Sequence, residues 1–405
     1  MKRLLAVLIL TMNFCFGYFI VEDDYAKQVE VLKSLDIDTS FLQDSIFESM
    51  KDNIRNYKTK QFLKTLENGA QFVPVLKKMI EEAEIPDVFL YLAMAESGFS
   101  TKAYSKAKAS GLWQFMSATA KKYNLLIDDY VDERRDPVKS TEAAIKYLQV
   151  LHDRFGKWYL AAMAYNCGEG RVSRAIAEAG TDNLYALLDE NKKYLPLETR
   201  NYIRKIVTMA YLSQDVNFLL DNGASYVLNG GDMSSPFVKV DVYGGSSLAD
   251  VAEAIDMPIR ELLAYNTHLK YFFTPPNKNR YHIYIPSNKL TRFKSDFKME
   301  KGNSKYYVYT VAKGDSLQKI AKQYDVSYKI IKDFNSMRSD TIRAGQKLII
   351  PTSSNTVKYY TIQKGDTLQS ISTKYKLTVA QLMQTNNLKD STIIPGVKLE
   401  IPASN

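Results

Sequence analysis

The stretch Ala95-Glu96-Ser97-Gly98-Phe99-Ser100 ends a run of largely apolar residues. A helix over residues 86–97 is expected, because it would open with a proline and end at a glycine. Glu96 would then lie near the C-terminal end of a helix that is buried on most sides. Lost hydration and the negative end of the helix dipole both favour the protonated carboxyl there. Such a group can act as a general acid, whereas a glutamate at a helix end that is solvated or paired with a lysine is the alternative.

Three more blocks follow in order and decide between these interpretations. They are Ala-Ser-Gly-Leu-Trp-Gln-Phe-Met at 109–116, Ala-Tyr-Asn-Cys-Gly-Glu-Gly-Arg-Val at 164–172 and Leu-Glu-Thr-Arg-Asn-Tyr at 197–202. With Glu96 and its neighbours, they resemble the lytic murein transglycosylases of the goose-lysozyme-like superfamily (family 23 glycosidases), most closely the membrane-bound D type. The resemblance implies an all-α lysozyme-like catalytic domain over residues 85–220. It also implies a lyase that cuts polysaccharide, with no cofactor.

The resemblance also implies the chemistry. These enzymes cleave the bond between N-acetylmuramic acid and N-acetylglucosamine with one glutamate, here Glu96, and the muramyl 6-hydroxyl attacks its own anomeric carbon. The product is a 1,6-anhydromuramyl end, and no water is consumed. Glu198 is interpreted as structural, through helix capping and an ion pair with Arg200, and Trp113 as a core residue. The residues implied to bind substrate are Ser105, Gln114, Phe115, Met116, Tyr165, Asn166 and Tyr202.

Two other functions compete with this one. A muramidase on the same fold would hydrolyse the bond and would need a second carboxylate with a bound water. Asp128, Asp129 and Asp132 are the available carboxylates, but we expect them to be solvated in an exposed loop. A non-catalytic wall-binding scaffold is the other alternative, and the intact Glu96 block argues against it.

The C-terminal part of the chain is repetitive. Tyr-Thr-Val-Ala-Lys-Gly-Asp-Ser-Leu at 309–317 recurs as Tyr-Thr-Ile-Gln-Lys-Gly-Asp-Thr-Leu at 360–368, 51 residues later. Residues 306–352 and 358–403 resemble LysM domains, small α+β (βααβ) modules that bind polymers containing N-acetylglucosamine. By this resemblance the glycan-binding residues are Gly314, Asp315 and Asn335 in one copy, and Gly365, Asp366 and Asn386 in the other.

A third, degenerate copy is expected at 237–287, where Ser246 replaces the aspartate of the Gly-Asp turn. Its glycan site is therefore in doubt, and it is interpreted as a LysM-like module or a structural bridge. Linkers are expected at 221–236 and 288–305, and an N-terminal helical segment packed on the catalytic domain at 18–84. Its expected helices are 25–35, 41–57 and 71–83.

The first 17 residues have a basic start and a short apolar run, which is typical of a secretory signal peptide. We therefore expect an exported, periplasmic protein. An uncleaved membrane anchor and lipidation of Cys15 are the alternatives that would attach it to a membrane through its N-terminus. If Cys15 is removed, Cys167 is the single remaining cysteine, and it is interpreted as a small buried residue.

The charge is uneven along the chain. Residues 288–405 hold 20 Lys/Arg against 9 Asp/Glu, whereas the remainder holds 34 against 36. Behind a signal peptide, the carboxylates of peptidoglycan are a more available polyanion than nucleic acid, and simple solvation of small domains is the alternative. No metal site is expected, because His152, His268 and His282 are scattered without ligand spacing. We expect a monomer.

Overall fold

The structure is a computed structural model, and it describes residues 25–224, 235–298, 306–324, 326–351, 358–363, 365–375, 378–386, 388 and 390–401. The expected signal peptide with Cys15 lies outside these ranges, as do residues 225–234 and 299–305 of the expected linkers. The chain divides into two compact units. The first comprises Met1–Val238, Leu263–Lys270 and Tyr284–Leu290, and the second comprises Lys239–Leu262, Tyr271–Ile283 and Thr291–Asn405.

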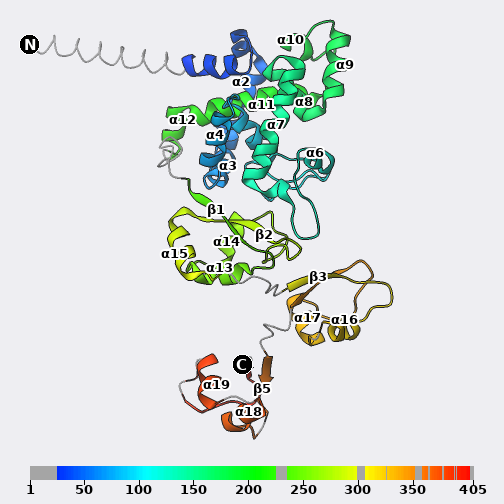
Figure 1. The fold of residues 1–405 in the computed structure, drawn as a ribbon. Helices are drawn as coiled ribbons and strands as arrows, with labels where there is room; N and C mark the ends of the chain where they lie inside the picture. Colours follow the sequence, from blue (N-terminus) through cyan, green and yellow to red (C-terminus); the bar gives the residue numbers. More distant parts are fainter. Residues whose placement is uncertain are drawn as a thin grey trace, which may run out of the picture. The chain divides into compact units, whose positions relative to one another are not determined.

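The catalytic part of the first unit is all-α, as predicted (Figure 1), and two of its helices are apolar. Helices α5 and α8 bury most of their residues, so they are surrounded by other helices and not laid on a surface. The elements of this part are α4 (Val73–Glu82), α5 (Phe89–Ser97), α6 (Ser117–Lys122), η3 (Glu133–Arg135), α7 (Pro137–Phe155), α8 (Trp158–Cys167), α9 (Glu169–Ala179), α10 (Leu184–Leu187), α11 (Leu197–Gln214) and α12 (Val216–Asp221).

The N-terminal helices pack on this core through buried charges as well as apolar side chains. Asp44 caps α2 by accepting from the backbone N–H groups of Ile46 and Phe47, and it also pairs with Arg204 of α11 at 2.9 Å. Residues 25–34 are helical, and the next elements are η1 (Thr39–Gln43), α2 (Ser45–Asn53), the π-helical turn η2 (Ile54–Lys58) and α3 (Thr59–Gly69). Helix α3 was not expected from the sequence.

Three βααβ modules follow, each with one two-stranded sheet. In the two LysM repeats the strands are antiparallel, with Tyr306 opposite Pro351 in the first and Lys358 opposite Ile401 in the second. The elements are β1 (Phe237–Tyr243), α13 (Leu248–Ala254), α14 (Ile259–Tyr265) and β2 (Arg280–Pro286); β3 (Tyr306–Thr310), α16 (Leu317–Gln323), α17 (Tyr328–Phe334) and β4 (Lys347–Pro351); and β5 (Lys358–Thr361), α18 (Leu368–Lys374), α19 (Val379–Thr385) and β6 (Lys398–Ile401).

The expected linker 288–305 is partly wrong. The turn η5 (Ser287–Lys289) and helix α15 (Leu290–Asp296) occupy its first half, and Phe293 of α15 is buried. Its high charge suggested a solvated connection, but the buried phenylalanine gives the segment one apolar anchor. The LysM-like module therefore extends beyond the expected end at 287.

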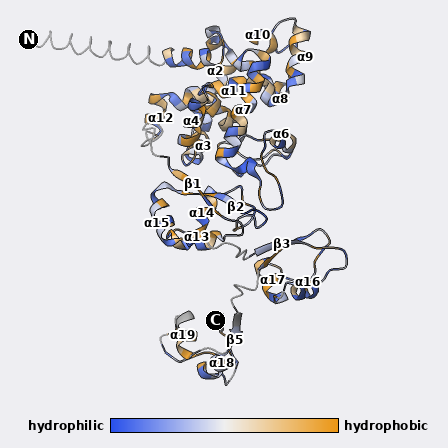
Figure 2. Ribbon diagram, viewed as in Figure 1, coloured by the Kyte–Doolittle hydropathy of each residue, from blue (hydrophilic) through white to orange (hydrophobic). Residues whose placement is uncertain are grey.

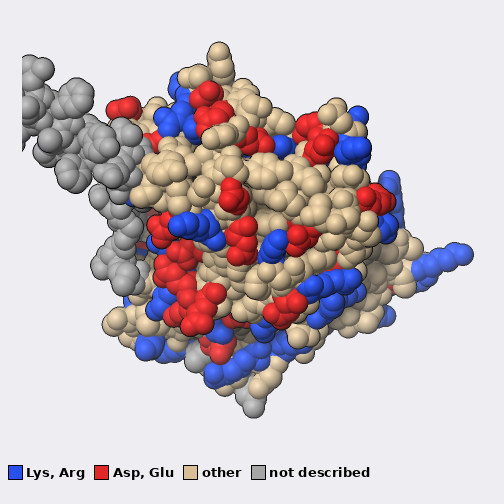
Figure 3. Space-filling view, turned by 90° about the horizontal axis from the view of Figure 1, so that it is seen from above, with Lys and Arg blue, Asp and Glu red and all other residues tan. Residues whose placement is uncertain are grey.

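The surface of the helical part is of mixed polarity. Most helices in Figure 2 carry both hydrophilic and hydrophobic residues, as expected where one face is buried. On the face drawn in Figure 3, acidic and basic side chains are interspersed among uncharged ones. No helix among the described residues is long and apolar enough to cross a bilayer.

Candidate functional site

Glu96 occupies the last turn of α5, as predicted. The helix ends at Gly98, which adopts the left-handed conformation with φ of 60° and donates its N–H to the Met94 carbonyl. Burial raises the pKa of the Glu96 carboxyl, and the nearby charge of Glu198 raises it further. A hydrogen bond from Tyr202 and the charge of Lys205 act in the opposite direction. The carboxyl therefore keeps a proton at higher pH than an ordinary glutamate does.

The partners of Glu96 come from one face of α11. Glu198, Tyr202 and Lys205 are spaced four and three residues apart, which places them in one row along the helix. The Tyr202 hydroxyl donates to Glu96 Oε1, and the Lys205 ammonium donates to the carbonyl of Ala95. Desolvation lowers the pKa of Lys205, while Glu96 and Glu198 raise it. Sequence reasoning found Tyr202 but missed Lys205, which the helical spacing from Tyr202 could have revealed.

A tightly folded loop, residues 100–116, carries four of the predicted substrate-binding side chains, Ser105, Gln114, Phe115 and Met116. Ser105 Oγ accepts from the backbone N–H of Ala109 at 3.0 Å, and Gln114 Nε2 donates to the carbonyl of Gly111 at 2.8 Å. Gly111 has φ of 83°, and a Cβ at this position would lie 1.7 Å from the Arg134 carbonyl oxygen. Only glycine allows this approach, which seats the loop on residues 133–135.

Aromatic side chains connect this loop to α8. The Tyr165 hydroxyl donates to the carbonyl of Trp113 at 2.7 Å, and its ring packs edge-on against Phe115 at 6.1 Å between centroids. Burial and the charge of Glu96 hold the pKa of Tyr165 well above its ordinary value. Phe115 is buried, whereas Met116 is 46% exposed. Trp113 is fully buried and donates to Thr141, so its interpretation as a core residue is confirmed.

The C-terminal end of α8 is fixed to the start of α11. Asn166 Oδ1 accepts from the Thr199 hydroxyl at 2.7 Å. The chain then turns at Gly168, which has φ of 89° and begins α9. Cys167 is half-buried, and burial raises the pKa of its thiol. The structure thus brings the blocks around Glu96, Tyr165, Asn166 and Tyr202 together, with the 100–116 loop tied to them through Trp113.

The prediction that Asp132 is solvated is wrong. Asp132 is 4% exposed and binds the Arg134 guanidinium at 2.8 and 2.9 Å. Asp128 is half-buried and accepts from the backbone N–H groups of Tyr130 and Val131, so it shapes the turn. Asp129 is exposed. The carboxylates of Asp128 and Asp132 are thus used to hold the loop.

The expected ion pair between Glu198 and Arg200 is also wrong. Arg200 is buried and pairs with Glu190 at 3.0 Å, while also donating to the carbonyl of Asp189. Glu198 is exposed in the first turn of α11. Its negative charge acts instead on Glu96 and Lys205.

In the LysM repeats the predicted glycan-binding side chains make hydrogen bonds inside each module. Asp315 accepts from the Tyr309 hydroxyl and the Ala312 N–H, both at 2.7 Å, and these bonds lower its pKa. Asp366 makes the equivalent bonds to Tyr360 and Gln363. Asn335 forms hydrogen bonds with Ile331 of α17 and with Ile349 of β4, and Asn386 forms one with Leu382. Gly314 and Gly365 have φ of 90° and 96°. These residues shape the loops, and their contact with glycan stays a prediction.

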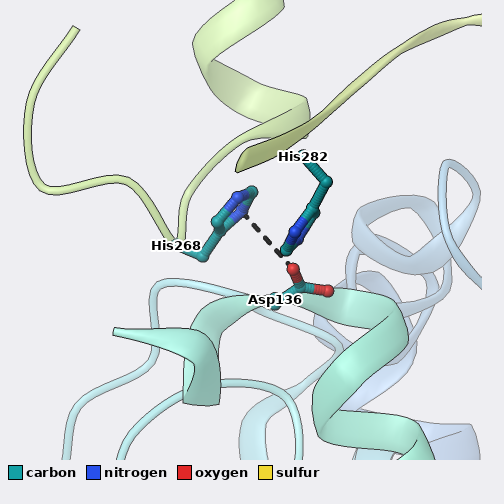
Figure 4. A group of neighbouring side chains, drawn as sticks. All are labelled: Asp136, His268 and His282. Atoms are coloured by element: carbon teal, nitrogen blue, oxygen red, sulfur yellow. Dashed lines mark ion pairs between the residues drawn. The ribbon is translucent and has the colours of Figure 1, made fainter. Parts of the chain in front are cut away.

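The buried carboxylate of Asp136 was not singled out from the sequence. Its Oδ1 caps α7 by accepting from the backbone N–H groups of Val138 and Lys139, and it also accepts from the Tyr284 hydroxyl at 2.8 Å. In Figure 4 a dashed line joins Asp136 to the buried His268, and His282 is also drawn; His268 Nδ1 lies 3.8 Å from Asp136 Oδ2. His282 belongs to the other compact unit and Asp136 caps a helix, so no metal site is proposed.

Comparisons with known proteins agree with this geometry. Residues 75–187 match the model of the transglycosylase SLT domain, residues 309–351 and 360–402 match LysM domains, and residues 236–298 match the LysM-like domain of the lytic transglycosylase MltD. The chain is 27% identical over 389 residues to the membrane-bound lytic murein transglycosylase D of Escherichia coli (strain K12), covering 89% of this chain and 82% of that protein. This chain therefore has the domains of a lytic transglycosylase.

Other similarities cover smaller parts of this transglycosylase. The cell wall-binding protein YocH of Bacillus subtilis (strain 168) is 41% identical over 93 residues, which is 23% of this chain and 32% of that protein. The 70 kDa soluble lytic transglycosylase of Escherichia coli is 27% identical over 38% of this chain and 25% of that one. The TM-score between the two structures is 0.28.

Proposed function

We propose that this lytic transglycosylase cleaves the β-1,4 bond between N-acetylmuramic acid and N-acetylglucosamine in peptidoglycan, without water, to leave 1,6-anhydromuramyl ends. The observation that carries the proposal is Glu96, a buried carboxyl with a raised pKa that accepts a hydrogen bond from Tyr202. The SLT domain and the relationship to lytic murein transglycosylase D support the same chemistry.

The groups around Glu96 suit a carboxyl that acts twice. First, protonated Glu96 gives its proton to the glycosidic oxygen, and the new carboxylate is stabilised by the Tyr202 hydroxyl and the Lys205 charge. The muramyl 6-hydroxyl then attacks the anomeric carbon of the same sugar, and Glu96 takes the hydroxyl proton. Glu96 thus gives one proton and takes one back, and the tethered hydroxyl takes the place of a bound water.

Hydrolysis by a muramidase is the alternative, and two observations disfavour it. The loop carboxylates Asp128 and Asp132 are engaged in backbone and guanidinium hydrogen bonds. Glu198 acts electrostatically on Glu96, but it is exposed. A muramidase would need a general base for water that lies across the sugar from the acid at a defined separation, whereas these carboxylates are engaged in other bonds or exposed.

The other predicted site residues have two roles, which are binding of the sugar in the catalytic domain and attachment of the enzyme to glycan through the LysM repeats. We propose that Ser105, Gln114, Phe115, Met116, Tyr165 and Asn166 line the sugar site. The LysM repeats hold the enzyme on glycan through the loops next to their Gly-Asp turns. In the first repeat a hollow next to these loops is lined by Ser339, Thr341, Arg343 and Gln346. We further propose a monomeric, exported periplasmic protein; attachment to the membrane through an uncleaved or lipidated N-terminus is the alternative.

Glu96→Gln tests the assignment in the full chain. The amide keeps the shape and removes the transferable proton, so cleavage of soluble glycan should fall by a factor of about a hundred or more. Binding to insoluble peptidoglycan should remain. Glu178→Gln, at an exposed position of α9, is the matched control and should behave as the wild type. Near-normal turnover by folded Glu96→Gln protein would remove Glu96 from the mechanism.

A further inference from the structure

A short stretch of the LysM-like module pairs with a loop of the catalytic domain inside the first compact unit. Residues 266–270 of the module lie beside residues 128–135, between Asp128, which shapes a turn, and Asp136, which caps α7. The pairing is a small antiparallel ladder: Asp132 N donates to His268 O at 2.8 Å, Lys270 N donates to Tyr130 O at 2.9 Å, and Val131 and Leu269 form a bridge.

Side chains add to this pairing. The Thr267 hydroxyl donates to the carbonyl of Arg135 at 2.9 Å, and the Tyr284 hydroxyl donates to Asp136 Oδ1 at 2.8 Å. Both bonds are made by buried side chains. Water competes poorly for such groups, so the bonds hold the two segments in register.

The braced loop in turn supports the sugar-binding loop. Arg134, in the middle of the braced segment, is 6% exposed and donates through Nη1 to the carbonyls of Lys108 and Phe115, at 2.9 and 3.1 Å. Gly111 lies directly on the Arg134 carbonyl. A continuous set of contacts therefore runs from Thr267 through residues 132–135 to the loop that carries Ser105 and Gln114.

The module keeps the contacts that fold it, but it lacks the aspartate that the LysM repeats have in their Gly-Asp turn. Asn266 bonds to both the N–H and the carbonyl of Tyr284 at 2.8 Å, as Asn335 does with Ile349 in the first LysM repeat. Ser246 stands where the repeats have their aspartate. The module thus keeps its fold, while its residues 266–270 contact the catalytic domain.

We propose that the LysM-like module is a brace for the substrate-binding loop: segments 263–270 and 284–290 hold residues 128–136, and Arg134 passes this order to residues 105–115. Thr267 and Tyr284 are thus positioning residues of the transglycosylase, and the partner of this surface is the catalytic domain itself. The inference rests on the proposed function for its activity readout, but the contacts can also be tested without activity.

The test uses the full chain with Thr267→Val and Tyr284→Phe, singly and together. Thr274→Val is the matched control, because Thr274 is also buried and donates to a backbone carbonyl, that of Tyr243, within the second unit. Three quantities are measured: melting temperature, kcat and KM on a short soluble glycan fragment, and amide hydrogen exchange of residues 105–115. Thr267→Ser keeps the hydroxyl and should restore wild-type values.

Each brace variant is expected to lose about fivefold in kcat/KM, mainly through KM, since one such bond is worth about 1 kcal/mol. The double variant should lose more and should show faster exchange over residues 105–115. Thr274→Val should lower the melting temperature without raising KM. A folded double variant with wild-type kcat/KM would overturn the brace, as would an equal KM increase in Thr274→Val. If the wild type cuts no glycan, the proposed function fails, and unchanged exchange would then overturn the brace independently.

Discussion

Replacing Tyr202 with phenylalanine removes the hydroxyl that donates to Glu96 and leaves a ring of nearly the same shape. Tyr202 is 5% exposed, so water is poorly placed to take over the bond. A hydrogen bond to a charged group is worth about 1.5–3 kcal/mol. If that stabilisation is felt when Glu96 becomes a carboxylate, kcat should fall by a factor of about 10 to 150.

Loss of the Tyr202 hydroxyl should also change the pH dependence of the reaction, by raising the pKa of Glu96. The Tyr202 hydroxyl stabilises the charged form of Glu96 and so lowers its pKa, against burial, which raises it. Without the hydroxyl, burial acts with less opposition and the pKa rises further. The protonated acid then persists to higher pH, and the alkaline limb of the kcat/KM profile should shift upward, while the rate at the optimum falls.

The assay is the pH profile of kcat and kcat/KM on a soluble glycan fragment. Tyr159→Phe is the matched control, because the Tyr159 hydroxyl donates to the remote carbonyl of Asp182. Its profile should overlay that of the wild type. A folded Tyr202→Phe enzyme with an unshifted alkaline limb and an unchanged kcat would refute the reasoning.

Three further predictions concern the other groups. Lys205→Met should also move the alkaline limb upward, because the lysine charge lowers the pKa of Glu96; a downward shift in the pH profile would contradict this. Asp315→Ala should loosen the first LysM repeat, since it removes acceptors for Tyr309 and Ala312; unchanged amide exchange in residues 309–317 would count against this. Deleting residues 306–405 should reduce activity on intact sacculi far more than on soluble fragments, because a tether raises local concentration only on a polymer. The advantage on sacculi should shrink at high salt, and an equal loss on both substrates would show that the repeats support the catalytic fold instead.

The parts of the fold that follow from local sequence were predictable. The helix before Glu96 and the βααβ repeats have apolar runs, turn glycines and a fixed repeat distance that one segment displays by itself. Helix α3 was missed because its buried positions, Phe62 and Leu66, are few among charged and polar residues. Such a helix is defined by what packs on it, which a single segment does not reveal.

The errors at the site concern burial that was misjudged and contact partners that are separated along the sequence. Asp132 lies in a stretch of sequence that is typical of an exposed loop, yet the side chain of Arg134, two residues later, pairs with it. Arg200 forms an ion pair with Glu190 of the preceding loop and not with Glu198 of its own helix. The pairing of residues 266–270 with 128–135 joins segments more than a hundred residues apart, and no local pattern specifies it.

The most direct test of the central claim is the mass of the glycan ends that the wild-type protein releases from purified sacculi. Attack by the muramyl 6-hydroxyl gives anhydro ends, which are lighter by one water than hydrolytic ends. A single buried acid, Glu96, with the tethered nucleophile predicts anhydro ends only, and none from Glu96→Gln. Reducing muramic acid ends, heavier by that water, would contradict the account and assign the protein to the muramidases.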